Sequence, residues 1–146
     1  FFPIACYKYA DSKSGGFRFW KKYSFAEFIL VAVLCGVVYI FTKEILIFFN
    51  ASTQTIIFLT PLVKFSLAIC LLMAVALPLE QLMFITGRNK SYIKTAISVT
   101  TINIILLVLF IYSYSIAGSI IAIVIAEALF IILYFKNSYL HLARKY

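Results

Sequence analysis

The sequence has few charged residues and few of the side chains that serve metal or nucleophilic chemistry. Only 12% of its 146 residues are charged, whereas about a quarter are charged in soluble domains. His141 is the only histidine and Asp11 the only aspartate. No cluster has metal-ligand spacing, and no GxSxG, P-loop or dinucleotide motif occurs. We therefore predict that the chain is not an enzyme and binds no cofactor or metal.

Cysteine is also scarce and unpatterned. The three cysteines are Cys6, Cys35 and Cys70. Their number is odd, none belongs to a CxxC pair, and two lie within apolar runs. We interpret them as small core hydrophobes rather than as disulfide partners or metal ligands.

What the sequence does have is a large excess of apolar residues. Hydrophobic residues make up 64% of the chain, and the mean hydropathy is +1.06. A soluble core of this size could not bury so much apolar surface, which favours lipid as the solvent. Because the first residue is phenylalanine, we expect a fragment of a longer protein. The net charge of +8 could indicate nucleic acid, but the cations cluster in short loops between apolar runs, so we expect no nucleic-acid partner.

Four apolar segments are long enough to cross a bilayer, which takes about 20 residues of helix. None shows the period-2 alternation of a barrel strand. The predicted fold is therefore all-α, a polytopic membrane bundle of four transmembrane helices. The predicted helices cover residues 24–42, 61–86, 91–112 and 116–135.

Basic and non-basic connections alternate along the chain. Eleven of the 13 Lys and Arg residues lie in 8–23, 87–94 and 136–146. Lys43 is the only cation between the first two predicted helices, and residues 113–115 contain none. The positive-inside rule then places the three basic segments, including the C-terminus, in the cytoplasm.

The first 23 residues are predicted to contain the end of a preceding helix and a basic cytoplasmic loop. Gly15 and Gly16 are expected to break this loop, with Trp20 and Tyr23 as anchors at the headgroup level.

Small residues and prolines predict how the helices pack. Spacing of four residues makes two stripes where backbones can approach closely. Pro61 is typical of a helix start. Pro78 is expected to kink or locally unwind its helix, either as a functional hinge or as a tolerated bend. The first stripe is Gly118, Ala122 and Ala126, and the second is Ser66, Cys70 and Ala74, continuing to Pro78.

Ionisable groups within apolar segments are costly and call for an explanation. Glu127 lies near the middle of its predicted helix, so it must face a bundle interior or a wet cavity, or be protonated. Either a gating role or a structural hydrogen bond explains it. Asn103, at similar depth, is the expected donor to its carboxyl group.

Two further charges lie within the predicted helix 61–86. Lys64 is expected either to extend to the outer headgroups or to face a cavity and attract an anionic substrate. Glu80 is about 24 Å of helix away from Lys64, so the two cannot pair. Arg88, Lys90 and Lys94 are the expected partners of Glu80.

The order of these features resembles the last helices of polysaccharide flippases in the multidrug/oligosaccharidyl-lipid/polysaccharide exporter superfamily. A helix ends in a Gly-[Arg/Lys]-x-Lys loop, followed by a helix with a mid-membrane Asn and then by a helix of small residues carrying a Glu. The start "FFPIACYKYA" is similar to the family's Phe-Pro helix end. The matching residues are Gly87, Arg88, Lys90, Asn103, Ile116, Gly118, Ala122 and Glu127.

This resemblance implies the C-terminal part of a 12-helix transporter in the bacterial cytoplasmic membrane. Such a transporter flips undecaprenyl-diphosphate-linked oligosaccharide outward. Its partners would be the lipid-linked oligosaccharide, membrane lipids and the remaining N-terminal helices. Lys64 would attract substrate anions, Glu80 and Glu127 would serve gating or ion coupling, and Asn103 would orient Glu127.

Three alternatives remain open. One is a multidrug exporter of the same superfamily. Another is a small four-helix drug exporter, although that class carries a carboxylate in the middle of its first helix and this chain has only Glu27 at the edge. The third is a non-transporting membrane scaffold subunit, which would not require Glu127.

Overall fold

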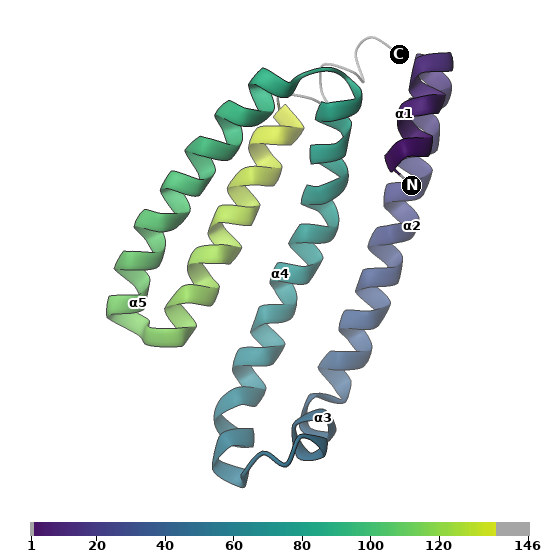
Figure 1. Cartoon of the computed structure of the whole chain (residues 1–146). Helices are drawn as coiled ribbons and strands as arrows, with labels where there is room; N and C mark the ends of the chain where they lie inside the picture. The colour runs from purple at the N-terminus through teal and green to yellow at the C-terminus, as the bar shows by residue number, and fades with distance from the viewer. Residues whose placement is uncertain (1, 137–146) are drawn as a thin grey trace.

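The computed structural model describes residues 2–136, which form helices and connections with no strand among them. The all-α prediction is confirmed for this part of the chain (Figure 1). The helices are α1 (Phe2–Asp11), α2 (Lys13–Ile40), α3 (Thr42–Phe48), α4 (Thr53–Ile85) and α5 (Asn89–Tyr134).

Helices α2, α4 and α5 are each long and apolar enough to cross a membrane. Their outward faces carry large apolar side chains, such as Leu30 at 61% exposure and Val108 at 66%. Water would disfavour such faces, whereas lipid tails solvate them. The fold is therefore that of a membrane-embedded helical protein.

Helix α5 folds back on itself at Ser115, where φ is 53° and ψ is −132°. Its two arms run antiparallel from this turn (Figure 1). Gly118 lies so close to the Phe110 carbonyl that a β-carbon on Gly118 would collide with it. The predicted break between residues 112 and 116 is thus a tight turn, and a glycine allows the two arms to approach.

Helix α4 packs against both α2 and α5. The predicted small-residue stripe on the second arm of α5 is confirmed as a packing surface, because all three of its residues are buried. On α4 the stripe is buried at Ala74 and Pro78, while Cys70 is exposed. A core of five buried residues joins α2, α4 and α5 near one end of the bundle: Trp20, Leu79, Leu82, Met83 and Tyr134.

The N-terminal segment differs from the predicted loop. Residues 13–23 are helical, and the chain breaks at Ser12 rather than at the two glycines. Ser12 has extended backbone angles, and its hydroxyl accepts a hydrogen bond from the Gly15 amide at 3.3 Å. This is N-capping by serine. Gly16 packs against the Tyr9 backbone with no room for a β-carbon.

Helix α4 also begins earlier than predicted. It starts at Thr53, where the Ser52 hydroxyl accepts from the Thr55 amide at 3.3 Å, and it ends at Ile85. Pro61 is therefore internal rather than a helix start. The backbone remains helical through Pro61 and Pro78, so the local unwinding considered at Pro78 is not present.

The basic segments lie together in space. The start of α2, the α4–α5 connection and the end of α5 share one end of the bundle, which we call the basic end (Figure 1). Helix α3, with Lys43, and the Ser115 turn lie towards the opposite end (Figure 1). Arg144, Lys145 and His141 fall outside the described residues.

Candidate functional site

Three of the four candidate residues line one cavity of about 190 Å³ between α4 and the two arms of α5. Glu80 comes from α4, Asn103 from the first arm and Glu127 from the second arm. Asn103 and Glu127 are equally far in sequence from Ser115, so an antiparallel hairpin places them at the same level. We call this space the carboxylate cavity; apolar side chains such as Val99 and Phe130 complete its wall.

Glu80 is held by a tyrosine rather than by one of the expected cations. The Tyr92 hydroxyl donates to Glu80 Oε1 at 2.7 Å. Tyr92 belongs to the first turn of α5, whereas Glu80 lies five residues before the end of α4. The bond therefore ties the two helices together across their short connection. Glu80 also lines the carboxylate cavity.

Asn103 does not make the predicted hydrogen bond. Both it and Glu127 line the cavity, but no hydrogen bond joins the two side chains. The Asn103 Oδ1 atom is buried and has no hydrogen-bond partner among residues 2–136. A buried, unpaired amide oxygen costs free energy, so the cavity has an unused acceptor beside a carboxylate.

Aromatic rings separate the carboxylate cavity from the basic end. The Tyr92 and Tyr134 rings are parallel within 3°, with their centroids 6.0 Å apart. The Phe130 ring is nearly perpendicular to the Tyr134 ring, and their centroids are 4.0 Å apart. Tyr134 is fully buried, and its hydroxyl has no hydrogen-bond partner in the described part of the chain. Sequence reasoning missed both tyrosines, because tyrosine in a membrane helix normally indicates an interfacial anchor.

Lys64 belongs to a different place in the molecule. It lies about three turns into α4 because that helix begins at Thr53. Its Nζ atom is 4.2 Å from the centroid of the Tyr39 ring, in a cation–π contact. Lys64 and Tyr39 line a pocket of about 360 Å³ between α2 and α4, and this pocket shares no lining residue with the carboxylate cavity.

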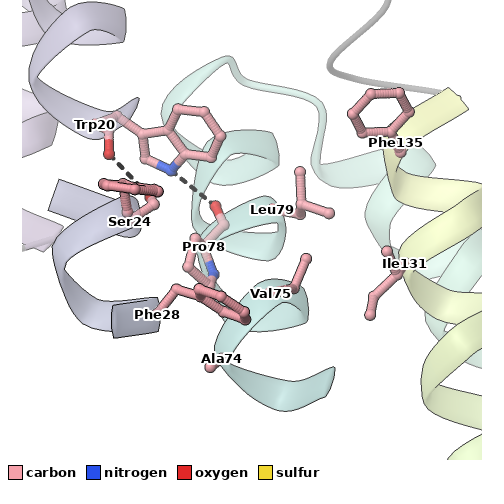
Figure 2. Close-up of a pocket in the computed structure, with 10 residues that line it drawn as sticks. Trp20, Ser24, Phe28, Ala74, Val75, Pro78, Leu79, Ile131 and Phe135 are labelled. Carbon is pink, nitrogen blue, oxygen red and sulfur yellow. Dashed lines mark hydrogen bonds between the residues drawn. The ribbon is translucent and has the colours of Figure 1, made fainter. Parts of the chain in front are cut away.

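Trp20 is not a lipid-facing anchor. Only 7% of its surface is exposed, and its indole N–H donates to the Pro78 carbonyl at 2.9 Å (Figure 2). The Trp20 carbonyl accepts from the Ser24 hydroxyl, also at 2.9 Å. Trp20 therefore joins α2 to α4 at the level of the internal proline.

The size of the carboxylate cavity limits its chemistry. Pockets for drug-sized ligands measure about 300–1,000 Å³, so about 190 Å³ accommodates waters or a small cation rather than an oligosaccharide. Two carboxyl groups and an amide oxygen can exchange protons or hold a small cation. Among residues 2–136, no group of three or more His, Cys, Asp or Glu residues has a metal-binding arrangement.

A scan against protein-family models and searches of curated proteins and of solved structures found no match to this chain.

Proposed function

We propose that this chain is part of a membrane transporter and that the carboxylate cavity is its coupling or gating site. The observation that carries the proposal is the convergence of Glu80, Asn103 and Glu127 from three helical segments on one cavity. Each of these polar groups is costly within an apolar helix, and residues of this kind mark ion and proton pathways. A purely structural bundle would gain more by filling the same space with apolar side chains.

The resemblance to polysaccharide flippases supplies the substrate class. We propose a lipid-linked oligosaccharide with a diphosphate group, moved from the cytoplasmic to the outer leaflet of a bacterial membrane. The carboxylate cavity is too small for such a substrate, which favours ion coupling there. Lys64, in its separate and larger pocket, is the candidate that would attract substrate anions.

The proposed topology has four spans, because each arm of α5 crosses the membrane. At about 1.5 Å per residue the arms measure about 39 Å and 28 Å, near the thickness of the hydrocarbon core. The basic end, and with it the C-terminus, then faces the cytoplasm. The remaining helices of a 12-helix transporter would pack against the exposed apolar faces.

The test is export of surface polysaccharide by the complete transporter carrying Glu127→Gln. We expect export to fall at least tenfold at normal protein abundance, because the glutamine amide can neither take up and release a proton nor carry a negative charge. Glu44→Gln makes the same chemical change at an exposed position on α3 and should leave export unchanged. Glu127→Leu should give normal abundance without export.

Normal export with Glu127→Gln would contradict the coupling role. Loss of drug resistance without loss of polysaccharide would instead favour the multidrug exporter. Tolerance of every substitution at Glu127 would favour a scaffold subunit.

A further inference from the structure

An apolar groove opens between α2, α4 and the second arm of α5, nearer the basic end than Lys64 and its pocket. Its volume is about 240 Å³. Figure 2 shows Trp20 and Phe28 of α2 on one side, Ile131 and Phe135 of α5 on the other, and Val75 and Leu79 of α4 between them. None of the residues that line the groove is charged.

Exposed lysines flank the groove at the basic end. Lys21 is one helical turn before Phe25 and two turns before Phe28, so the three share one face of α2. Lys136 directly follows Phe135 on α5. Both lysines are exposed, and neither pairs with a carboxylate within residues 2–136.

We infer that the groove binds the hydrocarbon tail of an anionic phospholipid whose phosphate is held by Lys21 and Lys136. The groove and its flanking lysines are complementary to a phospholipid in charge and polarity. Lys21 and Lys136, which pair with no carboxylate within residues 2–136, lie at the basic end, and the uncharged groove begins next to them on α2 and α5. A phospholipid presents the same order of groups, with an anionic phosphate above an apolar chain. Juxtamembrane lysines attract anionic headgroups in this way.

Bound lipid would have a structural consequence for the α2–α4 contact. The Trp20 indole both lines the groove and donates to the Pro78 carbonyl. A tail in the groove would cover the Trp20 ring and the adjoining Pro78 turn, which holds α2 to the helix bearing Glu80. This inference does not depend on the proposed transport function.

Trp20 also provides the probe, because it is the only tryptophan in the sequence. The full chain is reconstituted in phosphatidylcholine bilayers with a small fraction of lipid that carries brominated acyl chains. Bromine quenches tryptophan fluorescence at short range, so quenching reports occupancy of the groove. Brominated phosphatidylglycerol is compared with brominated phosphatidylcholine at equal mole fraction.

We expect phosphatidylglycerol to quench Trp20 at a lower mole fraction, by about fivefold for each lysine engaged. Lys21→Gln combined with Lys136→Gln should abolish this preference. Lys43→Gln, at the opposite end of the bundle, should preserve it. Val75→Phe, which fills the groove, should reduce quenching by both lipids while helicity by circular dichroism stays unchanged.

Equal quenching of the unmodified protein by the two lipids would overturn the inference. So would loss of the preference with Lys43→Gln to the same extent as with the double variant. An absence of quenching by either lipid in a fully helical protein would show that another occupant, such as a helix or a second copy of the chain, fills the groove.

Discussion

At the scale of single residues, the carboxylate cavity depends on how Glu80 is satisfied. Its carboxylate accepts a 2.7 Å hydrogen bond from Tyr92 rather than pairing with a cation. A neutral donor stabilises the carboxylate without adding a positive charge beside the cavity. The hydrogen bond thus fixes the orientation of the Glu80 carboxylate from α5.

Tyr92→Phe should lower the free energy of unfolding by about 1 kcal/mol, because side-chain hydrogen bonds between membrane helices contribute about 0.6–1.7 kcal/mol. The measurement is unfolding in mixed micelles with increasing sodium dodecyl sulfate, followed by circular dichroism. Tyr112→Phe is the matched control, since Tyr112 is 94% exposed on the same helix. Equal effects of the two substitutions would show that the Tyr92 bond contributes nothing.

The candidate residues were predictable individually, but their arrangement was not. Glu80, Asn103 and Glu127 are conspicuous because polar groups are rare in apolar runs. Their convergence depends on the register of α4 against the α5 hairpin, which no local pattern encodes. The hydrogen bond from Trp20 to Pro78 had no sequence signal, because a proline frees the carbonyl four residues earlier rather than its own.

At the scale of elements, the Ser115 turn sets that register. The two arms of α5 can close only if Gly118 lies against the Phe110 carbonyl. Asn103 and Glu127 then lie at the same height along the two arms, and both line the cavity. Gly118, which has no side chain, thus allows both arms of α5 to line the cavity.

Gly118→Ala should destabilise the protein by about 1–3 kcal/mol, the usual cost of overpacking a close contact. Gly36→Ala is the control, because nothing lies within 4 Å of the β-carbon it would add. That control should be neutral or stabilising by up to about 1 kcal/mol, since alanine favours helix over glycine. Thermal unfolding of both variants in the same detergent measures the difference in their stability. A Gly118→Ala protein as stable as the Gly36→Ala protein would contradict the close approach of the arms.

Trp20→Phe tests the contact between α2 and α4. It removes the indole donor to Pro78 but retains an aromatic ring, so we expect a loss of about 1 kcal/mol. Unfolding in sodium dodecyl sulfate followed by circular dichroism measures the loss. Phe25→Leu changes a 66% exposed side chain on the same helix and should have little effect. No difference between the two variants would mean that the indole bond does not stabilise the bundle.

The sequence predicted the apolar centres of the helices better than their ends. Hydropathy identified the turn near residues 113–115, because the polar residues there interrupt two long apolar runs. It missed residues 13–23 and 53–60, which are helical. Basic and polar residues extend a helix readily outside the hydrocarbon region, and serine caps at Ser12 and Ser52 set the starts.

At the scale of the whole molecule, the distribution of charge and the fold agree. The three basic segments gather at one end of the bundle as far as residue 136, although they are far apart in sequence (Figure 1). The positive-inside rule then implies one orientation for all the helices. In the proposed topology, the carboxylate cavity lies within the bilayer and the lysines that flank the groove lie at its cytoplasmic surface.

The central claim is that α5 crosses the membrane twice and holds Asn103 and Glu127 between its arms. The most direct measurement is labelling of single cysteines by a membrane-impermeant maleimide in intact cells and in inverted vesicles. The background replaces Cys6, Cys35 and Cys70, and cysteine is introduced at Asn50, Asn89 or Ser115. We predict labelling of positions 50 and 115 from the outer side and of position 89 from the cytoplasmic side. Labelling of positions 89 and 115 from the same side would contradict the account.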